Sequence, residues 1–212
     1  MRLKPDISDD LLSKWQKIVD LMATVVRVPA GLIMKVHPTE IEVFVSSDTE
    51  GNPYDKGEMA QLNTGLYCET VMARRAELLV PDAREDPEWA HNPDIKLGMF
   101  SYFGLPLEWP DGDVFGTICV LDKKKNRYSD TYRELICQFG EALKMDLKNL
   151  VTIFELERTQ RELQKMVNLM ANREVRIAGL KEIILQLRAQ PEQTGLTLVT
   201  DDSLKNIGKR KR

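Results

Sequence analysis

The sequence predicts an α+β domain, in which helices cover an antiparallel β-sheet, followed by a long coiled-coil helix. Three observations support this class. An amphipathic helical pattern runs from Ile7 to Val26. Two apolar runs flank a Pro-Asp-Gly-Asp turn at residues 110–113, which is the pattern of a β-hairpin. A further helical pattern begins at Ser129, a good N-cap residue, and meets no clear stop signal before Pro191.

Shorter elements are expected between the first helix and the hairpin. Glu40 to Ser46 alternates apolar and polar residues, and we expect it to pair as a strand with Gly31 to Lys35. Gly and Pro residues then indicate loops around a short helix and a short strand. We expect a loop at residues 47–58, a helix at 64–73 and a strand at 78–80. A polar loop at 82–94 is a candidate lid over the sheet.

The hairpin is expected to form the middle of the sheet. Its first arm, Tyr102 to Trp109, mixes aromatic and aliphatic residues. Its second arm, Val114 to Leu121, is nearly continuous β-branched and apolar sequence with Gly116 inside it. Such an arm is typical of a central strand, and its glycine indicates that another segment comes very close there.

The long helical pattern changes its period along its length. Its first part has the spacing of a helix that packs on the sheet, with apolar residues at Leu135, Phe139, Leu143, Leu147, Leu150 and Phe154. Later residues recur at heptad intervals, which is typical of a coiled-coil seam and predicts a parallel homodimer. The seam contains Leu156, Leu163, Met166, Met170, Arg173, Ile177, Leu180 and Ile184. Arg173 places a charge in this seam, which weakens a dimer while setting its register.

Composition limits the classes of function. The 212 residues have a net charge of −3, so nucleic acid is an improbable general partner, although the C-terminal end is locally basic. There is no apolar run of the length that a membrane span requires and no signal-peptide pattern, so we expect a cytoplasmic protein without a membrane partner. Three cysteines without a CxxC pair and two histidines argue against a disulfide scaffold and against a metal site.

Five short motifs, in this order and spacing, resemble the GAF family of sensory domains. They are YC at 67–68, VPDA at 80–83, Trp89 followed by NPD at 92–94, SYFGLPL at 101–107 and FGTICVLD at 115–122. The resemblance is to the bacterial branch that precedes diguanylate cyclases and histidine kinases. It implies a GAF/PAS-like antiparallel sheet sandwiched by helices at residues 1–152. NREVRI at 172–177 resembles a signalling helix, so we expect a coiled coil at 153–190 and a disordered basic tail at 191–212.

The same resemblance implies where a ligand would bind. In GAF domains the ligand lies between the sheet and the helix-and-loop layer that crosses it. The matching candidates here are Tyr67, Cys68, Trp89, Asn92, Tyr102, Thr117 and Cys119. The competing interpretation is that Trp89 and Tyr102 are core residues and that the NPD segment forms an Asx turn before a helix. The sequence identifies no cofactor.

Three functions remain open from the sequence. The first is a non-catalytic sensor that dimerises and relays a small-molecule or redox signal to a separate effector, such as a histidine kinase, a diguanylate cyclase or a transcription factor. The second is a small redox enzyme using Cys68, which lies near a helix start where the helix dipole lowers a thiol pKa. The patterns of the methionine-sulfoxide reductase and phytochrome relatives are not visible. The third is a structural dimerisation adaptor.

Overall fold

The computed structural model describes residues 4–189. The chain divides into two compact units, Met1–Glu155 and Leu156–Arg212. The first unit is an α+β fold built on one antiparallel sheet, so the predicted fold class is confirmed. The predicted tail at 191–212 lies outside the described residues.

The sheet has six strands in the order β3-β2-β1-β6-β5-β4, and every neighbouring pair is antiparallel. The centre is formed by β1 and β6, and β5 and β6 form the predicted hairpin. The strands are β1 (Ala30–Val36), β2 (Glu40–Ser46), β3 (Met59–Gln61), β4 (Leu78–Val80), β5 (Ser101–Glu108) and β6 (Val114–Asp122).

The close approach predicted at Gly116 is present in the central pair of strands. A Cβ atom at Gly116 would lie 1.8 Å from the backbone oxygen of Met34 on β1. The hairpin turn is held by two backbone bonds, from Trp109 N to Asp113 O at 2.8 Å and from Gly112 N to Trp109 O at 2.9 Å. Only glycine fits at 116 without moving the neighbouring strand.

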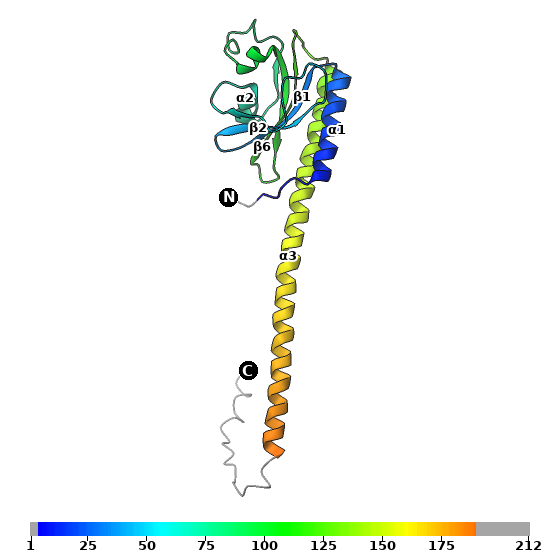
Figure 1. Cartoon of the computed structure of the whole chain (residues 1–212), viewed down its shortest axis with the longest axis vertical. Helices are drawn as coiled ribbons and strands as arrows, with labels where there is room; N and C mark the ends of the chain where they lie inside the picture. The colour runs from blue at the N-terminus through cyan, green and yellow to red at the C-terminus, as the bar shows by residue number, and fades with distance from the viewer. Residues whose placement is uncertain (1–3, 190–212) are drawn as a thin grey trace, which may run out of the picture. The chain divides into compact units, whose positions relative to one another are not determined.

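One face of the sheet is covered by α1 (Asp9–Val26) and by the first part of α3 (Asp130–Ala189), as Figure 1 shows. The Ser8 side chain caps α1 by accepting from Leu11 N. The buried residues of this layer include Trp15, Val19, Ile33, Phe103, Phe115, Ile118, Ile136 and Leu143. The predicted helix phase at the start of α3 is slightly off, because Ile136 is fully buried while Leu135 is half-buried.

The opposite face is covered by α2 (Tyr67–Arg74), by the 3-10 helix η1 (Pro93–Leu97) and by the loops around them. Two short elements, β3 and η1, were not predicted as a strand and a helix. In addition, α2 begins at Tyr67, later than the predicted residue 64, because Asn63 and Gly65 adopt positive φ angles that a helix does not allow. The second face therefore carries the least regular part of the fold.

The second unit contains the rest of α3, which is helical to Ala189. Every side chain described from Leu156 to Leu187 is exposed, including the apolar residues of the predicted seam. Among the described residues, no helix combines the length and the apolar character that a membrane crossing requires.

Candidate ligand-binding site

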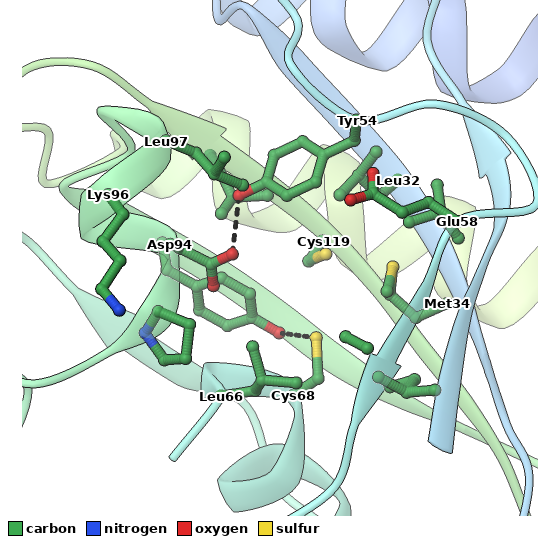
Figure 2. A pocket seen from close by; sticks show the side chains of 16 residues that line it. Leu32, Met34, Tyr54, Glu58, Leu66, Cys68, Asp94, Lys96, Leu97 and Cys119 are labelled. Carbon is green, nitrogen blue, oxygen red and sulfur yellow. Dashed lines mark hydrogen bonds between the residues drawn. The ribbon is translucent and has the colours of Figure 1, made fainter. Parts of the chain in front are cut away.

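A cavity of about 270 Å³ lies on the second face of the first unit, between the sheet and the layer formed by α2 and η1. Its walls are mainly apolar, and they come from strands β1, β2, β3, β5 and β6 as well as from this layer (Figure 2). The lining residues are Leu32, Met34, Ile41, Val43, Tyr54, Glu58, Ala60, Leu66, Cys68, Pro93, Asp94, Lys96, Leu97, Tyr102, Cys119 and Leu121.

A hydrogen bond joins two of the polar wall residues. The Tyr54 hydroxyl donates to the Asp94 carboxylate at 2.8 Å, as the dashed line in Figure 2 shows. Tyr54 belongs to the loop before β3, and Asp94 belongs to η1. The bond therefore holds together two loop segments that are 40 positions apart in the sequence.

The cavity shifts the protonation of Asp94. Loss of solvent raises the pKa of its carboxyl from 3.8 to about 6, because an apolar environment disfavours the charged form. The hydrogen bond from Tyr54 opposes this rise, and the nearby Glu58 carboxylate adds to it. Burial also raises the pKa of Tyr54 far above its ordinary value, so this phenol stays protonated and remains a donor.

Two thiols with polar neighbours form another part of the wall. The Cys68 sulfur accepts a hydrogen bond from the Thr117 hydroxyl at 3.3 Å and lies 3.6 Å from the Tyr102 hydroxyl. A hydrogen bond with Cys119, together with those from Thr117 and Tyr102, lowers the pKa of the Cys68 thiol, whereas the pKa of Cys119 is raised. All three cysteines are free.

The position of the Tyr102 ring depends on a glycine two residues further along β5. A Cβ atom at Gly104 would lie 2.1 Å from the Tyr102 hydroxyl oxygen and 2.5 Å from the ring carbon that carries it. Residues two apart on a strand share a face, so the tyrosine ring lies over the space that the glycine leaves empty. Gly104 thereby allows Tyr102 to reach Cys68.

The seven candidates from the sequence gather on this face, but only three of them line the cavity. Cys68, Tyr102 and Cys119 are in its wall. Tyr67 and Trp89 lie outside the lining as an aromatic stack: the Tyr67 ring centroid is 4.8 Å from that of Tyr102 and 5.1 Å from that of Trp89. This places Trp89, which is 6% exposed, in the apolar cluster of this layer.

The other two candidates do not line the cavity, although each forms a hydrogen bond with a residue that does. Asn92 caps η1 by accepting from Asp94 N at 2.8 Å, and it donates to the backbone oxygen of Gly65 at 2.8 Å. Thr117 is fully buried behind Cys68, to which it donates. The Asx-turn interpretation of the NPD segment is thus realised at the start of η1. The segment that borders the cavity is η1, rather than most of the predicted lid at 82–94.

Sequence reasoning missed the polar residues Tyr54, Glu58, Asp94 and Lys96. The NPD pattern signals a turn at Asp94, but nothing in it indicates that the carboxyl faces a cavity. No group of three or more metal-ligating residues occurs among residues 4–189.

The first unit is thus an antiparallel sheet with a helical layer on each face and a cavity under the less regular layer. The family model for the GAF domain matches residues 10–146, which is more than half of the sequence, so the chain belongs to the GAF domain family. GAF domains are typical of sensory and signalling proteins. A comparison with curated protein sequences gives no significant match.

Solved structures share the fold at low sequence identity. The blue-light absorbing form of the PixJ GAF domain from Thermosynechococcus elongatus aligns with a TM-score of 0.59 and 13% identity, covering 73% of this chain and 96% of that one. The GAF domain of a phosphoenolpyruvate-protein phosphotransferase from Coxiella burnetii aligns with a TM-score of 0.53 and 14% identity, covering 65% and 82%. At these identities the comparisons establish the shared fold.

Proposed function

We propose that this protein is a non-catalytic cytoplasmic sensor, in which the cavity binds a small, largely apolar molecule and α3 carries the effect to an effector protein. The observation that carries the proposal is the cavity itself, which has an apolar wall and a few polar groups from different elements. This is the usual composition of a ligand site. Membership of the GAF family supports the same function.

The relay part of the proposal rests on α3. The helix starts at Asp130 in the first unit, where Ile136 and Leu143 pack against the sheet, and it continues into the second unit. A shift of the sheet on ligand binding would act directly on these buried residues, since a helix transmits displacement along its axis. A histidine kinase, a diguanylate cyclase or a transcription factor would suit such a relay.

The homodimer part rests on the exposed seam. Leu156, Leu163 and Met170 are 64%, 57% and 69% exposed in the single chain, although they follow the heptad spacing of a coiled coil. A second copy of the helix would cover this stripe. In such a dimer, one coiled coil would join the two sensor units.

Ligand binding can be tested with a cavity-filling variant. Native mass spectrometry of freshly purified full-length protein should reveal a co-purifying small molecule, and a thermal-shift screen should find stabilising apolar compounds. Ala60→Phe places a ring in the cavity and should abolish both signals. Met59→Phe is the matched control, because Met59 is the neighbouring residue on β3, is 44% exposed and does not line the cavity. Equal binding by both variants would refute the proposed site.

A thiol-based redox sensor is the second candidate function. The observation that favours it is the pair of thiols, Cys68 and Cys119, in the wall of one cavity. Oxidation of either would change the chemistry of the wall without a bound ligand. Labelling of the native thiols distinguishes the two candidates, because a redox function predicts fast reaction at Cys68.

A further inference from the structure

The Asp94 carboxylate has an unusual environment within the cavity. Its side chain extends from η1 toward Tyr54, which is the one donor to its carboxylate oxygens among the described residues (Figure 2). Most of the surrounding wall is aliphatic or aromatic. A carboxylate in such surroundings is poorly solvated, and one neutral donor compensates only part of the lost hydration.

The charged groups near Asp94 do not neutralise it. Glu58 on the opposite side of the cavity is another carboxylate, and it acts unfavourably on the ionised Asp94. Lys96 is the one cationic residue in the lining, but it is exposed and forms no ion pair with Asp94 in the described part of the chain. The lining therefore has two acidic residues, the half-buried Asp94 and the exposed Glu58, and its one cationic residue, Lys96, is also exposed.

We propose that the ligand of this cavity carries a positive charge, as a protonated amine or an amidinium group on a small apolar body, and that Asp94 binds this charge with Glu58 assisting. The inference rests on the proposed function and adds the chemical class of the ligand. A poorly solvated carboxylate gains most from a partner that supplies both opposite charge and hydrogen-bond donors. An ammonium group supplies both.

The rest of the cavity fits the apolar body of such a ligand. The volume of about 270 Å³ is slightly below the roughly 300–1,000 Å³ of sites for drug-sized molecules. The aromatic rings of Tyr54 and Tyr102 line the same space, and such rings attract cations as well as apolar groups. A compound with one aromatic ring and one amine matches these features.

The test compares two compounds of nearly equal shape on the full-length protein. Phenethylamine is charged at neutral pH, and phenethyl alcohol is its neutral counterpart. Calorimetry and thermal shift should show at least about tenfold tighter binding of the amine. Asp94→Asn, which keeps an oxygen to accept from Tyr54, should remove this preference, and Glu58→Gln should reduce it. Asp55→Asn is the matched control, since Asp55 is an exposed residue of the loop that contains Tyr54 and Glu58 and does not line the cavity. This variant should bind the amine as the wild type does.

Three results would overturn the inference. Equal binding of the amine and the alcohol would show a cavity for neutral ligands, and the proposed function would stand. An amine preference that persists in Asp94→Asn would place the binding elsewhere. Binding of neither compound up to millimolar concentration would also refute the cationic class, and the Ala60→Phe comparison would then decide separately whether the cavity binds any ligand.

Discussion

The Tyr54 hydroxyl donates to the Asp94 carboxylate at 2.8 Å and so ties the loop before β3 to η1 at the edge of the cavity. Burial keeps the Tyr54 hydroxyl protonated, and it also raises the pKa of the Asp94 carboxyl, which favours the protonated form. The contact thus depends on the cavity that it borders. Each state of Asp94, charged, neutral or paired with a ligand, should change how firmly the two segments are held.

Asp94 should make the free protein less stable at neutral pH than at acidic pH. Its folded-state pKa of about 6 lies above the ordinary 3.8, so the folded state holds the proton more tightly than the unfolded state. The stabilising effect is complete below pH 3.8 and is lost as the pH rises through 6. Asp94→Asn should therefore raise the free energy of unfolding by about 2 to 3 kcal/mol at pH 8 and by little at pH 3.5. Urea unfolding at both pH values measures this.

The Tyr54 hydroxyl provides the control for this effect. In Tyr54→Phe the ring remains but the donor that favours the charged carboxylate is lost, so the pKa of Asp94 should rise further. A carbon NMR titration of the carboxyl group reports the pKa directly. A lower pKa in this variant would contradict the assignment of the hydrogen bond.

The sequence allowed much of the sheet to be predicted and little of the cavity wall. The hairpin from Tyr102 to Leu121 was predictable because its turn residues and apolar arms are local signals. Tyr54 and Asp94 were not, because their contact joins positions 40 residues apart and depends on how two irregular segments fold over the sheet. The role of Trp89 was ambiguous for a related reason, because an aromatic residue in a loop is compatible with both a core position and a ligand site. Its 5.1 Å ring contact with Tyr67, which the sequence does not reveal, places it in the apolar layer.

Gly104→Ala should destabilise the domain and displace Tyr102. The added methyl group would lie 2.1 Å from the Tyr102 hydroxyl oxygen, so the ring must leave its place beside Cys68, at a cost of about 1 to 3 kcal/mol. Gly140→Ala is the matched control. Its methyl group would lie 3.4 Å from Leu105 Cδ1 and 3.6 Å from Ile118 Cγ2, which is ordinary van der Waals contact. Alanine is also more favourable than glycine in a helix interior by about 1 kcal/mol. Denaturant unfolding should show a lower free energy of unfolding for Gly104→Ala and a higher one for Gly140→Ala.

Trp89→Ala should lower stability even without a ligand. Trp89 is 6% exposed and its ring contacts Tyr67, so its loss leaves a cavity in the apolar layer and should cost about 3 to 5 kcal/mol. His91→Ala, in the exposed part of the same loop, should change stability by less than about 0.5 kcal/mol. An unchanged melting temperature for Trp89→Ala in the ligand-free protein would remove Trp89 from the core.

The native thiols should react at very different rates. Cys137 is half-buried on α3, whereas Cys68 and Cys119 are 8% and 1% exposed, so a bulky disulfide reagent at neutral pH should modify Cys137 first. Cys137→Ser should eliminate the fast phase, and Cys68→Ser should leave it unchanged. A fast phase that disappears in Cys68→Ser would instead favour the redox function, since the lowered pKa of Cys68 makes it the more reactive thiol once a reagent has access.

The coiled-coil proposal predicts that Arg173→Leu tightens a parallel homodimer. In such a dimer the two Arg173 side chains would meet in the seam, where like charges repel and their desolvation is unfavourable. Leucine at this position would join Met170 and Ile177 in a continuous apolar stripe. Lys165→Leu is the matched control, because it adds the same side chain on the outer side of the heptad. Sedimentation equilibrium at micromolar concentration should show a lower dissociation constant for Arg173→Leu alone. A monomeric wild-type protein under these conditions would refute both the seam and the relay that depends on it.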